Sequence, residues 1–136
     1  MENAIILKHV SVIFNELQDK GYGRNIVIDA SEPKIQEEIT KWVKNNNING
    51  GVAKFKDYTN KEGNTTKQYT FKLSDYTKFD GKDGLSEKDL GYGAIINLQA
   101  RSYTYENKFG KGTSASLDGV FIVESAKNTV MNNISE

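Results

Sequence analysis

The hydrophobic positions along the chain predict a protein built mainly of β-strands. Residues 4–14 begin as an apolar run and then alternate with polar residues, and residues 24–29 form a second short apolar segment. Both patterns are typical of strands that are buried on at least one face. Strict alternation places Ile6 and Val10 on one face of the first strand and Leu7 on the other.

One segment has the periodicity of an amphipathic helix. Its apolar residues recur every three or four positions, at Ile35, Ile39, Trp42 and Val43. Ser31 can act as an N-cap, and Pro33 suits the first turn. The pattern predicts a helix over about 31–44 with Trp42 in the protein core.

The second half of the chain returns to strand patterns. Strands are expected at 52–58, 67–73, 94–105 and 117–124. The connection over 74–93 is polar and contains four glycines, so we expect a long, mobile loop there. Five or six strands with a single helix favour a small β-barrel, with the helix covering one of its open ends, over a doubly wound sheet.

The composition excludes several kinds of chemistry. The chain of 136 residues has no cysteine and one histidine, which rules out disulfides, thiolate metal sites and a multi-histidine zinc site. His9 alternates with apolar residues, so we expect a partly buried, hydrogen-bonded side chain and not a general base. No apolar run reaches the ~20 residues that a membrane span needs. We therefore expect no catalytic residue, metal, cofactor or membrane partner.

The strand expected at 94–105 has two unlike faces. One is small and mostly apolar, as a barrel interior requires: Ala94, Ile96, Leu98, Ala100, Ser102 and Thr104. The other carries amides, a guanidinium group and rings: Ile95, Asn97, Gln99, Arg101, Tyr103 and Tyr105. The loop expected at 106–112 adds Lys108, Phe109 and Lys111. Such side chains can stack on nucleic-acid bases and bind phosphates.

Charge along the chain supports this interpretation locally. Eighteen basic residues balance eighteen acidic ones, so the net charge selects no partner. The segment from Lys41 to Lys72, however, contains seven lysines and only two acidic residues. Within it Lys67 and Tyr69 share a strand face with apolar neighbours, and a core role and a binding role both remain open. Ordinary strand packing explains any one aromatic residue, but the cluster over 101–111 favours binding.

Two longer stretches resemble a known family. The first runs LKHVSVIF (7–14), RNIVIDA (24–30) and SEPKIQEEITKWVKN (31–45); the second is GYGAIINLQARSYTYENKFGKGTSASLDGVFIVE (91–124). Together they are similar to bacteriophage single-stranded DNA-binding proteins with a single OB-fold, distantly those of T7-like phages. The resemblance implies one OB-fold domain over 1–124, with five or six strands and one capping helix, followed by a polar, flexible tail over 125–136.

The resemblance also implies a function. It indicates sequence-independent binding of single-stranded DNA in phage-type replication or recombination, in the bacterial host cytoplasm. The implied DNA-binding residues are Arg101, Tyr103, Tyr105, Lys108, Phe109, Lys111, Lys67 and Tyr69. Replication or recombination proteins and a homodimer remain open as further partners, although the end of the chain lacks the acidic run that recruits partners in many such proteins. The alternative is a non-catalytic phage or mobile-element module that binds another protein through the same face.

Overall fold

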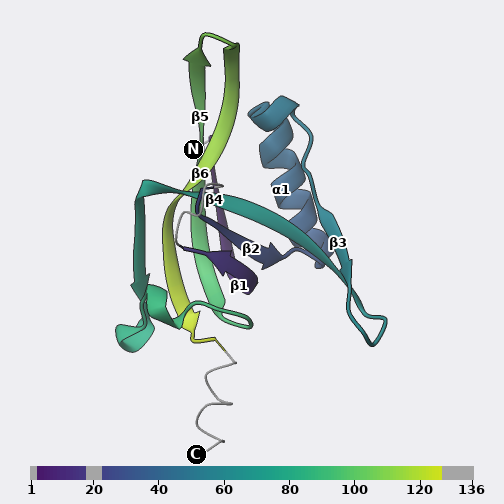
Figure 1. The fold of residues 1–136 in the computed structure, drawn as a ribbon, viewed down its shortest axis with the longest axis vertical. Coiled ribbons are helices and arrows are strands. Elements are labelled where there is room, and N and C mark those ends of the chain that lie inside the picture. The colour runs from purple at the N-terminus through teal and green to yellow at the C-terminus, as the bar shows by residue number, and fades with distance from the viewer. Residues whose placement is uncertain (1–2, 18–22, 127–136) are drawn as a thin grey trace, which may run out of the picture.

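Strands make up most of the protein in the computed structural model, which describes residues 3–17 and 23–126 (Figure 1). The strands are β1 (Ala4–Glu16), β2 (Asn25–Asp29), β3 (Lys56–Thr59), β4 (Thr65–Gly81), β5 (Ile95–Asn107) and β6 (Gly110–Glu124). The helix α1 spans Pro33–Asn45, and three short 3-10 turns span η1 (Ile48–Gly50), η2 (Lys82–Gly84) and η3 (Glu87–Asp89). No helix in this part of the chain is long and apolar enough to cross a membrane.

Five of the strands close into a ring. β1 pairs antiparallel with β2 and β5, β5 pairs antiparallel with β6, and β2 pairs antiparallel with β4. A parallel pairing of β4 with β6 completes the circle. β3 lies outside the ring and pairs with β4. The ring is filled by apolar side chains, among which Val10, Ile26, Ile96, Leu117 and Ile122 are almost completely buried.

A β-bulge in β1 changes which side chains face the core. Leu7 pairs with β5 normally, the pairing shifts, and it resumes at Val10, so both residues point inward. Ile6 instead points outward and is 58% exposed, which corrects its assignment to the same face as Val10. His9 sits in the bulge with a left-handed backbone (φ 55°) and an exposed side chain, so the expectation of a partly buried histidine is wrong.

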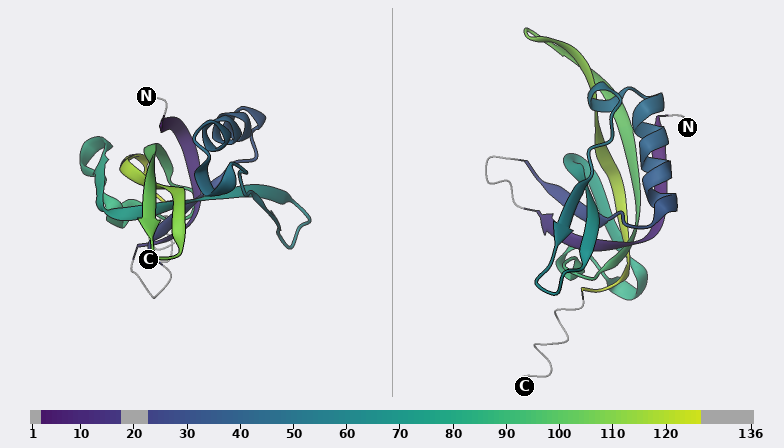
Figure 2. Two further views of the ribbon diagram at one scale, coloured as in Figure 1. Left: turned by 90° about the horizontal axis from the view of Figure 1, so that it is seen from above. Right: turned by 90° about the vertical axis from the view of Figure 1, so that its right-hand side faces the viewer.

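The helix begins at Pro33, two residues later than expected, and packs beside β1 (Figure 2). Its buried residues are Ile39, Trp42 and Val43. The Trp42 ring lies 6.2 Å from the Phe71 ring, and its indole Nε1 donates a hydrogen bond of 3.2 Å to the main-chain oxygen of Asn3. The prediction that Trp42 is a core residue is confirmed.

The prediction of a long loop over 74–93 is wrong for the first half of this segment. β4 continues to Gly81, because residues 78–81 form the parallel ladder with β6. The pairing shifts between Leu73 and Lys78, where the Thr77 hydroxyl donates a 2.6 Å hydrogen bond to the main-chain oxygen of Leu117. The partner strand β6 lies about 40 residues further along the chain, so the sequence around residues 74–81 shows only its polarity, which is typical of a loop.

The last two strands are also longer than expected, and they form a projecting hairpin. β5 pairs with β1 only as far as Arg101, and β6 pairs with β4 only from Leu117 onward. Residues 102–116, here called the arm, therefore extend beyond the barrel as a two-stranded ribbon (Figures 1 and 2). The loop expected at 106–112 is a tight turn at Lys108 and Phe109.

The expected division of β5 into two faces is confirmed inside the barrel. Its inward residues Ile96, Leu98, Ala100 and Ser102 are buried, and so is Ala94, which directly precedes the strand. Thr104 was expected to join them, but it is exposed because it lies on the arm, where no barrel interior remains to cover it. Most of the polar tail expected over 125–136 lies outside the described residues, as do residues 18–22 of the first expected loop.

Replacing Trp42 with alanine is expected to lower the free energy of unfolding by about 3–5 kcal/mol, because the change leaves a large cavity beneath the helix. Chemical denaturation of the full chain measures this loss. Tyr92→Ala is the matched control, because that ring is exposed and its removal creates no internal cavity. Equal stability of the two variants would show that Trp42 does not hold the helix on the barrel.

Candidate nucleic-acid interface

One face of the arm is an aromatic surface laid over small residues. Tyr103 is 48% exposed and Tyr105 is 45% exposed, and both point to the same side of β5. Opposite them, β6 carries only small residues, with Ser114 paired to Tyr103 and Gly112 paired to Tyr105. A Cβ atom at Gly112 would collide with the Tyr105 ring, so this ring lies across the neighbouring strand. The two rings thus present broad, solvent-facing surfaces.

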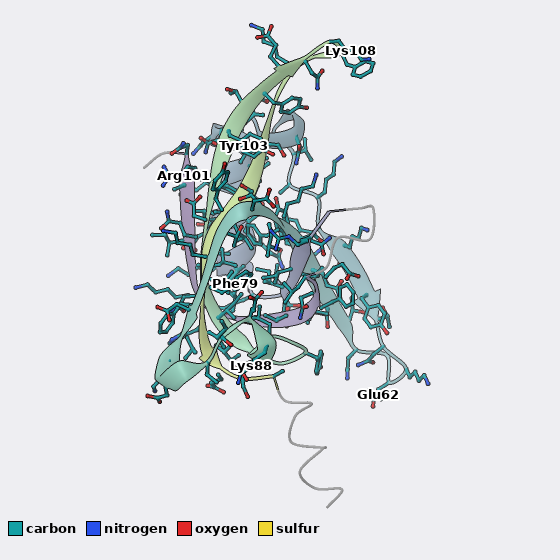
Figure 3. The ribbon with its side chains drawn as sticks, turned by 60° about the vertical axis from the view of Figure 1, so that its left-hand side comes forward. Glu62, Phe79, Lys88, Arg101, Tyr103 and Lys108 are labelled. Atoms are coloured by element: carbon teal, nitrogen blue, oxygen red, sulfur yellow. The ribbon has the colours of Figure 1, made fainter. Side chains whose placement is uncertain are left out.

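Arg101 lies on the same face of β5 as the two tyrosines, closer to the barrel (Figure 3). Its Nε donates a 3.0 Å hydrogen bond to Oδ2 of Asp118, and the same oxygen accepts a 3.0 Å hydrogen bond from Nε2 of Gln99. Asp118 can reach both residues because the pairing of β5 with β6 shifts there, which leaves Asp118 outside the ladder. The guanidinium charge is therefore partly neutralised by a carboxylate within the protein.

The tip of the arm carries an exposed aromatic ring beside positive charge. Phe109 is 87% exposed, and the Lys108 Nζ lies 5.2 Å from the centre of its ring. The main-chain nitrogen of Phe109 donates to Oδ1 of Asn107, which stabilises the turn. Lys111 is exposed and pairs in register with Glu106. The fold therefore places five of the six predicted residues between 101 and 111 on the arm and the sixth, Arg101, at its base.

Lys67 and Tyr69 lie elsewhere, in the first half of β4, where Lys67 pairs with Asp57 of β3 and Tyr69 pairs with Ile28 of β2. Lys67 makes a 3.0 Å ion pair with Asp57. The Tyr69 ring is half-buried between Phe55, at 5.4 Å, and Phe71, at 5.0 Å, and burial raises the pKa of its hydroxyl. These contacts favour the packing role that the sequence left open for Tyr69. Contact of either residue with a ligand stays a prediction.

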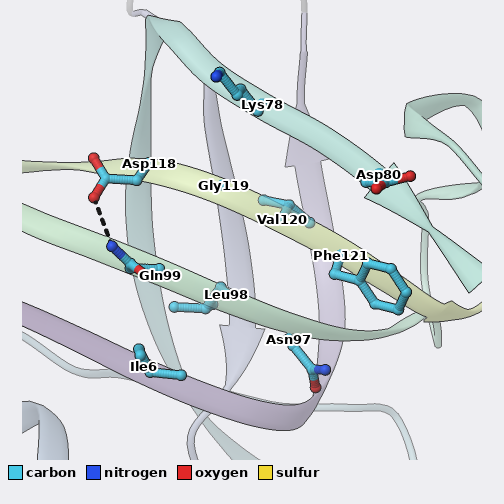
Figure 4. Close-up of a pocket in the computed structure, with 10 residues that line it drawn as sticks. All are labelled: Ile6, Lys78, Asp80, Asn97, Leu98, Gln99, Asp118, Gly119, Val120 and Phe121. Atoms are coloured by element: carbon cyan, nitrogen blue, oxygen red, sulfur yellow. Dashed lines mark hydrogen bonds between the residues drawn. The ribbon is translucent and has the colours of Figure 1, made fainter.

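The sequence pattern missed a groove on the outer face of the barrel. It has a volume of about 360 Å³, and Figure 4 shows the side chains that line it. Two of them, Asn97 and Gln99, share the outer face of β5 with Arg101. Its lining residues come from four strands: Ile6, Lys78, Asp80, Asn97, Leu98, Gln99, Asp118, Gly119, Val120 and Phe121. Two bulges, which sequence alternation cannot reveal, decide this lining: the bulge in β1 puts Ile6 on the face opposite Val10, and the bulge in β6 turns Asp118 outward. Within the described residues there is no cluster of acidic and histidine side chains that could hold a metal ion.

Comparison with known structures shows the fold. No protein-family model matches the chain, and no curated protein sequence does. A C-terminally truncated single-stranded DNA-binding protein of bacteriophage Enc34 aligns with a TM-score of 0.62 and 16% identity, over 92% of this chain and 86% of that chain. A second structure of the Enc34 protein gives 0.61 and 17%, over 92% and 83%. A third, in complex with single-stranded DNA, gives 0.59 and 16%, over 92% and 88%.

The predicted fold is confirmed by this likeness. The chain is a mainly β protein with a closed ring of strands and one helix, and it has the OB-fold of the Enc34 protein. The resemblance to phage single-stranded DNA-binding proteins that the sequence suggested therefore extends over most of the chain at the level of the fold.

Proposed function

We propose that this protein binds single-stranded DNA without sequence preference, through the outer face of the arm. The observation that carries the proposal is the pair of exposed tyrosines, Tyr103 and Tyr105, laid over small residues on a projecting ribbon. The Enc34 protein with the same fold is described in complex with single-stranded DNA, which supports the same ligand here. Each base has a flat π-face, so stacking on tyrosine tolerates any sequence.

The spacing of the side chains suits an extended strand of DNA. Alternate residues on a β-strand lie about 6.6–7 Å apart, so Tyr103 and Tyr105 can stack on successive bases of a stretched chain. Lys108 and Lys111 at the tip then face the phosphates, and Phe109 offers one more ring. Arg101 contributes a guanidinium group that Asp118 both positions and partly neutralises. The mechanism needs no bond-making step and no cofactor.

The wider role follows from this binding mode. A protein that coats single strands without sequence preference serves phage-type DNA replication or recombination in the host cytoplasm. We assign this activity to one OB-fold domain over 1–124, with 125–136 as a polar tail. Replication proteins and a second copy of the chain are candidate partners.

A second candidate function is protein binding through the same face. The 87% exposure of Phe109 favours it, because exposed aromatic residues dominate many protein interfaces. The two functions differ in their response to salt. Binding to DNA releases counterions and weakens steeply as salt rises, whereas a protein-binding module would not bind an oligonucleotide at all.

Tyr103→Ala and Tyr105→Ala are each expected to weaken binding of labelled oligo(dT) by about 1–3 kcal/mol, because each removes one stacked base. Fluorescence polarisation at two salt concentrations measures both the affinity and its salt dependence, and the latter should change little. Tyr92→Ala is the control, since that ring is exposed and precedes the start of β5, at the opposite end of this strand from the arm. Full affinity in both folded arm variants would place the DNA elsewhere.

Lys108→Ala and Lys111→Ala are each expected to reduce the slope of log affinity against log salt by about 0.7, the value for one phosphate contact on a single strand. A salt titration of oligo(dT) binding measures the slope. Lys88→Ala serves as the control, because Lys88 lies at the opposite end of the molecule from the tip of the arm (Figure 3). A slope that both arm variants share with the wild type contradicts phosphate contact at the tip.

Asp118→Asn is expected to strengthen binding and to steepen the salt slope by up to about 0.7, because the Arg101 charge becomes available to a phosphate. Stability should change by no more than about 1 kcal/mol, as is usual for an ion pair exposed to solvent. The Arg101→Gln, Asp118→Asn double variant is the matched control and should lose the gain. Weaker binding by Asp118→Asn alone would show that holding Arg101 in place matters more than its charge.

A further inference from the structure

The groove on the barrel exists because one outward position on β6 has no side chain. Gly119 pairs with Gln99 of β5 on one side and with Lys78 of β4 on the other, so it lies in the middle of the sheet. Two apolar side chains form the walls, with Ile6 58% exposed and Phe121 39% exposed. The result is a hollow with an apolar interior and polar groups along its edge (Figure 4).

Two amide side chains at the groove are held in fixed orientations. Asn97 accepts a 2.9 Å hydrogen bond at Oδ1 from the main-chain nitrogen of His9, which the bulge in β1 directs toward it. Gln99 donates from Nε2 to the Asp118 carboxylate. The main-chain N–H of His9 can bond only to the amide oxygen of Asn97, and the carboxylate of Asp118 can bond only to the amide nitrogen of Gln99. The two bonds therefore fix the orientation of both amide groups.

These orientations leave one donor and one acceptor free at the groove. Among residues 3–17 and 23–126, Nδ2 of Asn97 and Oε1 of Gln99 have no hydrogen-bond partner. The two residues alternate on β5, which separates them by about 6.6–7 Å along the strand. Asn97 leans toward β1 and Gln99 toward β6, so a ligand with an acceptor or a donor on its edge can bond to one group or the other (Figure 4).

The groove also continues the proposed DNA-binding face. Asn97 and Gln99 share the outer face of β5 with Arg101 and Tyr103, and Gln99 lies four residues, or about 13 Å, from Tyr103. The groove is lined by Lys78, Asp80 and Asp118, and Asp118 is paired with Arg101 beside it. With no excess of positive charge, the groove itself favours a neutral ligand over a phosphate.

We propose that the groove binds one nucleobase of the same DNA strand, beyond the bases that stack on the tyrosines. The base packs between Phe121 and Ile6, above the bare backbone of Gly119, and its polar edge bonds to Asn97 or to Gln99. All four bases carry both a donor and an acceptor on their Watson–Crick edges, so the site remains sequence-tolerant. The inference rests on the proposed function, because it requires a strand bound along β5.

The decisive variant is Gly119→Leu, which fills the groove. A Cβ atom at Gly119 would lie 3.6 Å from the main-chain oxygen of Lys78, an ordinary contact, and the backbone there is not left-handed. The side chain is therefore expected to fit without disturbing the barrel. Thermal melting checks the fold, and Phe121→Ala, which removes one wall, is a second variant that tests the same site.

The measurement uses the shortest oligo(dT) that binds with full affinity, so that the strand cannot slide. A series with one abasic position, moved along the oligonucleotide, locates the base that occupies the groove. In the wild type, loss of that base is expected to weaken binding about 5- to 150-fold, the usual range for one stacked base. Gly119→Leu should weaken binding of the intact oligonucleotide by a similar factor, and the abasic change at that position should then have no further effect.

Three results would overturn the inference, and they can be told apart. Wild-type protein that does not bind oligo(dT) refutes the proposed function and the groove together. Normal DNA binding by folded Gly119→Leu and Phe121→Ala, alongside weak binding by Tyr103→Ala, refutes the groove and leaves the proposed function in place. Normal DNA binding with altered self-association, measured by sedimentation, identifies the groove as a contact between copies of this chain instead.

Discussion

The parallel pairing of β4 with β6 is the constraint on which the rest of this structure depends. It joins residues 78–81 to residues 119–122, far apart in sequence, and it closes the ring of five strands. Closure satisfies the main-chain hydrogen-bonding groups of strands that would otherwise form open sheet edges. It also requires β4 to shift register after Leu73, because the strand must leave β2 before it can pair with β6.

The features proposed to bind DNA lie where the pairing between strands ends or where its register shifts at a bulge. β5 and β6 extend past the ends of β1 and β4, to which they pair in the barrel. The extended part of the two strands is the arm, with Tyr103 and Tyr105 exposed on one side. The bulges at His9 and Asp118 rotate individual side chains onto the same outer face without opening the ring. A stable barrel thus supports an exposed aromatic surface that contributes little to the core.

Acidic side chains lie next to several of the basic side chains in this protein. The net charge is zero, and basic residues only slightly outnumber acidic ones on the arm, with two lysines and one glutamate, and on β4, with three lysines and two aspartates. Lys67 and Arg101 each have an acidic partner. Asp118 beside Arg101 and Asp57 beside Lys67 lower the positive potential at those points. In the proposed function, stacking on aromatic rings then supplies much of the affinity, and the free lysines at the tip set its salt dependence.

The sequence by itself determined the features that depend on local periodicity: the helix with Trp42 inward, the mainly β composition, and the two faces of β5 within the barrel. Only the tertiary structure decided the length of β4, the arm, the outward turn of Ile6 and the packing of Tyr69 against other rings. The physical reason is that a polar strand and a loop look alike until the partner strand is known. A bulge likewise reverses the alternation of inward and outward side chains. It is a shift in the pairing of two strands, so the sequence of one strand does not reveal it.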